Sequence, residues 1–129
     1  MQSAKKKKNS QEKIPNPKKK DLHNTINWLV ATYPNCFNLR FPRPLKVGII
    51  NDIFSKEQWP HSKKLLRKGL GFYAASFLYQ NALLRDAHRI SLEGVIVDEV
   101  TEPQKQLAKE KLEEIKEKRR LGKVMQMKL

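Results

Sequence analysis

Apolar residues recur every three or four positions along most of this chain, which is the spacing of helices that bury one face. The pattern predicts helices over residues 24–33, 45–54 and 63–83. Pro34 ends the first helix, because the residue before a proline is disfavoured in helical geometry. Ser62 is a suitable N-cap for the third and longest helix. The predicted fold class is therefore mainly α.

Two glycines, Gly69 and Gly71, lie inside the third predicted helix. A glycine in a helix interior costs about 1 kcal/mol relative to alanine. We expect these glycines at sites of close packing or where another backbone approaches, and the sequence leaves open which.

A short break in the helical pattern predicts a β-hairpin. The apolar runs 90–92 and 95–97 flank Glu93 and Gly94, a pair suited to a tight turn with Gly94 at positive φ. An isolated hairpin is only marginally stable in water, so this one is expected to pack against the helices.

A last helix is predicted from Thr101, which forms a capping-box pattern with Gln104. The residues expected to dock its first half on the domain are Leu107, Leu112 and Ile115. Beyond Lys116 the sequence becomes basic and the apolar pattern fades, so the helix is expected to fray there.

Charge is segregated along the 129 residues, whose formal net charge is +14. Residues 1–20 hold eight lysines and one acid, and residues 40–68 hold eight bases and two acids, whereas residues 69–102 hold two bases and five acids. A lysine-rich stretch with little to bury is typical of disorder. We expect a disordered tail over 1–20, a folded domain over 21–120 and a basic extension beyond it. The bases inside the folded part predict a polyanionic partner.

Other classes of site have little support in the sequence. Cys36 is the only cysteine, so it cannot form a disulfide within the chain, and it is expected to be a small buried residue. The three histidines are far apart, and the glycines are too scattered for a phosphate-binding loop. We therefore expect no metal, no cofactor and no enzyme activity. The absence of a membrane-length apolar run or a signal peptide predicts a cytoplasmic protein.

The most informative segment is residues 43–49, Arg-Pro-Leu-Lys-Val-Gly-Ile. Pro44 suits the first turn of a helix, and the apolar residues after it continue at helical spacing. Arg43 and Lys46 would then stand at a helix start, where the macrodipole favours acids. Bases suit this position if they and the free backbone amides hold an external anion such as phosphate. The alternative is a core helix with two solvated bases.

Four features in order resemble the FinO/ProQ family of bacterial RNA chaperones. They are Tyr-Pro-Asn-Cys-Phe at 33–37, the segment 43–49, the basic and then aromatic helix 63–79, and the hairpin 89–94 that leads into 107–120. The resemblance covers roughly residues 24–120. It implies a small helical domain with one hairpin and a basic concave face. It also implies binding of small RNAs and mRNA 3′ regions, as terminator hairpins with a single-stranded 3′ tail, in post-transcriptional regulation.

The resemblance further implies where RNA is bound. Lys46 and Gly48 correspond to a helix N-terminus that holds the RNA 3′ end, and Tyr79 corresponds to a tyrosine near the terminal nucleotides. With the bases of the long helix, the hairpin and the last helix, the predicted RNA-binding residues are Arg43, Lys46, Gly48, Lys63, Lys64, Arg67, Lys68, Tyr79, Arg89 and Lys109. Gly71 departs from the pattern, because a relative carries an arginine there.

Two other functions fit the same charge. One is a general basic nucleic-acid-binding protein, associated with ribosomes or DNA and without 3′-end specificity. The other is a protein-interaction module whose last helix docks on a partner. For single residues, Tyr79 is alternatively a core or rim tyrosine, and Arg67 and Arg89 alternatively form surface ion pairs. No apolar face is left over for self-association, so we expect a monomer.

Overall fold

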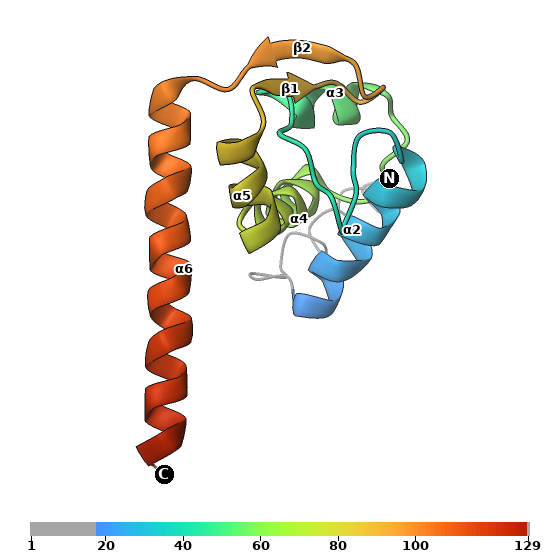
Figure 1. Cartoon of the computed structure of the whole chain (residues 1–129). Helices are drawn as coiled ribbons and strands as arrows, with labels where there is room; N and C mark the ends of the chain where they lie inside the picture. Colours follow the sequence, from blue (N-terminus) through green and yellow to red (C-terminus); the bar gives the residue numbers. More distant parts are fainter. Residues whose placement is uncertain (1–17, 129) are drawn as a thin grey trace.

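The structure, a computed structural model, describes residues 18–128 and the side chains up to residue 122. Within this range it contains five helices: α2 (Lys19–Thr32), α3 (Ile49–Ser55), α4 (Lys63–Ala74), α5 (Phe77–Arg85) and α6 (Glu102–Lys128). The strands β1 (His88–Ile90) and β2 (Ile96–Glu99) form one antiparallel hairpin that crosses one end of the helical layer (Figure 1). The predicted mainly helical class with a single hairpin is confirmed.

Helix α2 begins earlier than the apolar pattern indicated. The Lys18 amide donates to Oδ2 of Asp21 at 3.1 Å, and the Asp21 carboxylate lies in the first turn, where it complements the helix dipole. Residues 18–20 therefore lead into or begin the helix, which corrects the boundary of the predicted tail. The remainder of that tail lies outside the described residues. Thr25 and Leu29 are buried where α2 packs along α4.

The core lies among α2, α3, α4 and α5 and beneath the hairpin. Its most deeply buried large side chains include Phe37, Ile53, Leu66 and Ile90. Most of the buried core residues lie in the first three predicted helices, 24–33, 45–54 and 63–83. Cys36 is buried as expected, and burial raises the pKa of its thiol to about 12.

The second helix begins at Ile49 rather than at Leu45, which corrects the sequence prediction. The preceding segment is extended and pairs with β1: the Lys46 amide donates to the Ile90 carbonyl, and the Ile90 amide donates to the Pro44 carbonyl, both at 2.9 Å. Gly48 then adopts a φ of 82° as the N-cap of α3. Pairing with a distant strand satisfies the backbone here, so the helical spacing of the side chains does not decide the conformation.

The predicted long helix over 63–83 is in fact two helices. α4 ends at Ala74, and α5 follows Ser76, whose hydroxyl accepts a hydrogen bond from the Tyr79 amide at 3.2 Å. Nε2 of Gln80 donates to the Ala74 carbonyl at 2.6 Å, which satisfies an acceptor at the end of α4. The hydrogen bond by which Ser76 caps α5 competes with the backbone hydrogen bonds that would continue α4.

The hairpin exists as predicted, but its strands are displaced along the sequence. The loop between them runs from Ser91 to Val95, where the Ser91 amide donates to the Val95 carbonyl at 2.8 Å. Gly94 has the predicted positive φ, of 83°. Arg89 pairs with Asp98, and the register shifts immediately after Arg89.

Helix α6 is capped as predicted. The Thr101 amide donates to Oε1 of Gln104 at 2.9 Å, and the Gln104 amide donates to Oγ1 of Thr101 at 3.3 Å. The expectation that the helix frays after Lys116 is wrong, because it continues through the described chain and extends past α5 (Figure 1). The Arg119 guanidinium lies 4.9 Å from the centre of the Phe77 ring, which continues the packing beyond that point. No helix within residues 18–128 combines the length and apolar character of a membrane span.

A lysine that the sequence patterns did not reveal fastens α6 to α5. Nζ of Lys105 donates to the carbonyls of Leu83, Leu84 and Asp86 at 3.1, 3.3 and 2.8 Å. A cation there satisfies free carbonyls and complements the negative end of the α5 dipole. Of the residues expected to dock, Leu112 is buried and Ile115 is half-buried, but Leu107 is exposed.

Candidate nucleic-acid interface

Five of the ten predicted site residues line one cavity between α3, α4, α5 and β1, which we call the basic cavity. Its volume is about 290 Å³. The predicted members are Lys46, Gly48, Arg67, Tyr79 and Arg89, and the remaining lining residues are Leu45, Ile49, Ile50, Leu70, Gly71 and Ala74. The predicted members come from four separate segments, so only the tertiary fold brings them together.

Arg89 is the group in this cavity that most needs explanation. Its side chain is buried, with 8% of the residue exposed, and it forms no ion pair with any described residue. Nη1 donates to the Leu45 carbonyl at 2.6 Å, while Nε has no hydrogen-bond partner in the described part of the chain. A buried charge without a counter-ion is costly. The surface ion pair considered as the alternative is not formed among the described residues, and the guanidinium has no acidic partner there.

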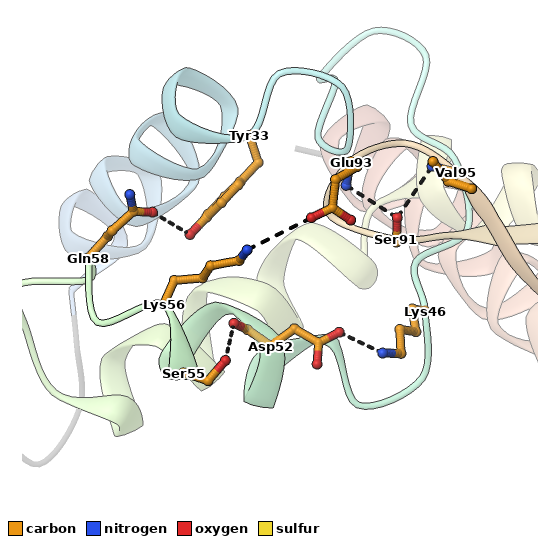
Figure 2. A network of polar contacts seen from close by, with 9 residues as sticks. All are labelled: Tyr33, Lys46, Asp52, Ser55, Lys56, Gln58, Ser91, Glu93 and Val95. Atoms are coloured by element: carbon orange, nitrogen blue, oxygen red, sulfur yellow. Dashed lines mark hydrogen bonds and ion pairs between the residues drawn. The ribbon is translucent and has the colours of Figure 1, made fainter.

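Lys46 lies at the rim of the cavity and is paired with an acid that the sequence prediction missed. Its Nζ is 2.8 Å from Oδ2 of Asp52, in the first turn of α3 (Figure 2). Both side chains are more than a third exposed, so water screens the pair, and pairs of this kind contribute about 0–1 kcal/mol. An incoming phosphate can therefore replace Asp52 as the partner of Lys46. Figure 2 also shows Lys56 reaching Glu93 of the hairpin loop, at 3.9 Å.

Of the four backbone amides from Leu45 to Gly48, two donate hydrogen bonds within the domain and two do not. The Leu45 amide donates to the Tyr79 hydroxyl at 2.9 Å, and the Lys46 amide donates to the Ile90 carbonyl. Free backbone amides were expected in the segment 43–49, and the amides of Leu45 and Lys46 are not free. The amides of Val47 and Gly48 donate no hydrogen bond within the part of the chain that the structure describes, and both residues are exposed. These two amides are the ones available to an anion.

Tyr79 belongs to the core rather than to an exposed stacking surface. It is 5% exposed, and its ring centre lies 5.7 Å from that of Tyr73. Burial raises the pKa of its phenol, partly offset by the hydrogen bond from the Leu45 amide and by Arg89. Its hydroxyl fixes the segment that carries Lys46, so the residue positions the cavity. The core position considered as the alternative for Tyr79 is therefore the one observed, and a contact with the terminal nucleotides stays a prediction.

Four bases crowd the first two turns of α4, beside the basic cavity, and no acid accompanies them in the first turn. They are Lys63, Lys64, Arg67 and Lys68. Lys63 ties α4 to α3, because its Nζ is 3.4 Å from Oδ1 of Asn51 and 5.1 Å from the centre of the Phe54 ring. The other three are exposed and form no ion pair with a described residue, which removes that alternative for Arg67.

Two predicted residues lie elsewhere. Arg43 lines a different cavity, together with Phe41 and His88. Lys109 is exposed on α6 and does not line the basic cavity. Over residues 18–128 no cluster of three or more histidine, cysteine or acidic residues is arranged to hold a metal ion.

Sequence reasoning did not include two polar or backbone features of this region: Gly71, which lines the basic cavity, and Asp52, which pairs with Lys46. Asp52 could have been found as the acid nearest to Lys46 within a basic stretch. Gly71 was visible as an unexplained glycine in a helix, and a Cβ built there would meet no atom within 4 Å.

Residues 19–124 match the model of the ProQ/FINO family. The chain belongs to this family. It is 36% identical over 112 residues to the RNA chaperone ProQ of Alteromonas mediterranea, a match covering 84% of this chain and 48% of that protein. It is also 36% identical over 104 residues to the RNA chaperone ProQ of Idiomarina loihiensis, which covers 78% and 49%. The chain thus spans about half the length of these curated relatives.

Solved structures of ProQ/FINO proteins have the same fold. The solution structure of a ProQ homologue from Legionella pneumophila matches with a TM-score of 0.64 and 36% identity, covering 77% of this chain and 86% of that one. The crystal structure of a FinO-like RNA chaperone from Neisseria meningitidis matches with a TM-score of 0.61 and 23% identity, covering 78% and 88%. The second likeness concerns the fold alone. The family resemblance seen in the sequence is confirmed.

Proposed function

We propose that this ProQ/FINO domain binds structured RNA through the basic cavity and the adjacent bases of α4, as part of an RNA chaperone in post-transcriptional regulation. Its ligands are hairpins with a single-stranded 3′ tail, as found in small RNAs and mRNA 3′ regions. The names of the curated relatives support RNA as the partner. The charge of the chain supports it independently.

The observation that carries the proposal is the buried guanidinium of Arg89. It has no acidic partner among the described residues, and it shares its cavity with Lys46 and Arg67. Cations gathered in a partly closed space attract a polyanion more strongly than the same charges spread over a surface. A phosphate near the RNA 3′ end would accept hydrogen bonds from Arg89, Lys46 and the free Val47 and Gly48 amides.

The bases of α4 have a second role in this proposal. Duplex RNA offers side chains little sequence information in its deep groove, so proteins recognise its phosphates, its shape and its unpaired ends. Lys63 and Arg67 lie four residues apart and therefore follow one face of α4, next to the cavity. The stem of a hairpin would lie along this row while its 3′ tail enters the cavity.

The proposal is tested by titrating a labelled terminator hairpin with full-length wild-type protein and with Lys46→Ala. Loss of one charge-assisted contact is expected to weaken binding roughly tenfold at moderate salt. The matched control is Lys118→Ala, which removes an exposed base from α6. A phosphate on the RNA 3′ hydroxyl should weaken binding to the wild type, because it enlarges the terminus that the cavity must hold.

Equal binding by wild type and Lys46→Ala would refute the site. Indifference to the 3′ phosphate would leave a general basic nucleic-acid-binding protein, which is the second candidate. That candidate predicts similar affinity for duplex DNA and for the terminator hairpin at matched salt. A competition between the hairpin and the same hairpin without its tail separates the two candidates.

Further expectations remain predictions. We propose a cytoplasmic monomer without catalytic activity. The lysines of residues 1–20 would increase RNA affinity mainly at low salt, because such contacts release condensed counter-ions.

A further inference from the structure

We propose that the hairpin carries a second RNA contact on its other side, a groove for an unpaired strand built around Phe41 and Arg43. The inference rests on the proposed function and extends it, because it gives the domain two separate surfaces for RNA. The groove, which we call the hairpin groove, has a volume of about 350 Å³. It is lined by Phe41, Arg43, Arg85, Asp86, Ala87, His88 and Ile96.

The hairpin separates this groove from the basic cavity. Side chains alternate between the two faces of a strand, and along β1 His88 lines the hairpin groove while Arg89 lines the basic cavity. The two cavities share no lining residue. The two cavities are therefore formed by separate sets of residues.

Phe41 is the most exposed large apolar side chain among the described residues, at 71%. Its outward position is fixed by the backbone, because Oδ1 of Asn38 accepts hydrogen bonds from the amides of Arg40 at 2.9 Å and Phe41 at 2.8 Å. Ile96 of β2 lies across the groove and is 56% exposed. An aromatic ring exposed to water on a hydrogen-bonded turn has no role in the core, but it is suited to stack on a nucleobase.

The charges around the ring favour a strand of nucleic acid over an acidic or apolar peptide. Arg43 forms no ion pair with any described residue. Asp86, the one acid among the described residues that line the groove, is already held by Arg85, with Nε and Nη2 at 3.0 and 3.1 Å from its two oxygens. Arg85 also donates to the Pro42 carbonyl at 3.4 Å, which joins it to the Phe41–Arg43 segment. A free guanidinium beside an exposed ring matches a phosphate next to an unstacked base.

The occupant is therefore a single-stranded stretch of RNA. Duplex RNA is a poor fit, because its bases are stacked inside the helix and cannot reach Phe41. A protein with the hairpin of one RNA in its basic cavity and an unpaired strand of another in the hairpin groove would hold both close together.

The test uses full-length protein saturated with unlabelled terminator hairpin, so that the basic cavity is occupied. Fluorescein-labelled octauridylate is then titrated, and its anisotropy gives the affinity. Wild type is expected to bind it, and Phe41→Ala is expected to bind it about fivefold to thirtyfold more weakly through lost stacking. Arg43→Gln should also weaken octauridylate binding and reduce its salt dependence. The matched control is Val97→Ala, which removes an exposed apolar side chain from the same hairpin but outside the groove.

Three results would overturn the inference. Octauridylate that fails to bind the hairpin-saturated wild type leaves no second site. A Phe41→Ala variant that loses affinity for the hairpin itself makes Phe41 part of the first site. A Phe41→Ala variant with unchanged octauridylate binding but an altered oligomeric state in sedimentation makes the patch a contact between copies. Failure of the proposed function is seen separately, as hairpin binding that Lys46→Ala does not affect.

Discussion

Each of the two faces of α4 carries a glycine, and the two glycines have opposite effects on the space around the helix. On the face toward α2, a Cβ at Gly69 would lie 2.4 Å from Cγ2 of Thr25, so glycine is required for the helices to approach. On the face toward the basic cavity, Gly71 has open space around it. One glycine allows close packing, and the other keeps a wall of the cavity open at the cost of helix stability.

The inner and outer faces of α4 are therefore under different constraints. The inner face of α4 is determined by packing, where any added atom must displace another. The outer face is free of that constraint, so its composition can serve an outside partner. Arg67 and Gly71 line the basic cavity from this outer face, and Arg89 faces them from β1. Substitutions on the two faces should therefore affect different quantities.

The largest effect is expected from Gly69→Ala. The methyl group would overlap the Thr25 side chain, and overpacking of this kind costs about 1–3 kcal/mol. Thermal or urea unfolding should show the loss, and RNA affinity measured well below the midpoint should change little. A stability equal to wild type would mean that α2 and α4 separate easily, and the contrast between the two faces would disappear.

Arg89→Met should have the next largest effect, and on binding alone. Loss of hydrogen bonds from a charged donor should weaken hairpin binding by about 2 kcal/mol, which is roughly thirtyfold. The Tm should stay the same or rise, because methionine fills much of the space without burying an unpaired charge. Fluorescence anisotropy and a thermal melt check the two parts. A marked fall in Tm alongside the lost affinity would make Arg89 a structural residue.

Gly71 offers a paired test of the open face. Gly71→Ala should stabilise the domain by about 0.5–1 kcal/mol through helix propensity and leave RNA affinity unchanged. Gly71→Arg should give a similar stabilisation, increase affinity and steepen the dependence of binding on salt by about one contact. Urea unfolding and a salt series of titrations separate these effects. Weaker binding by the arginine variant would show that RNA needs the space itself.

The smallest effect is expected from Lys109→Ala on α6. Lys109 is exposed and does not line the basic cavity, so it should contribute only to general attraction. The change in hairpin affinity at physiological salt should be less than about twofold, because screening weakens distant charges. A loss comparable to that of Arg89→Met would place RNA along α6 and extend the interface beyond the cavity.

The sequence by itself determined which elements make up the fold, and it predicted the kind of partner. Helical spacing, the Thr101 and Gln104 capping box and the Gly94 turn are local signals, and each specifies its element with residues close together in the chain. The segregation of charge likewise needs no structure, because it is a property of order along the chain. The segment 43–49 also indicated the family, although its sequence did not reveal that its backbone is extended.

Only the tertiary structure decided the conformations that depend on distant partners. The segment around Leu45 is extended because Ile90 and Tyr79 accept its amides, and neither residue is near it in sequence. The same contacts bury Arg89 and turn Arg43 toward a different groove. Periodicity indicates which face of an element is apolar, but it carries no information about which backbone groups find partners elsewhere. The burial of a charged side chain, seen for Arg89 and not for Arg43, arises only when those partners meet.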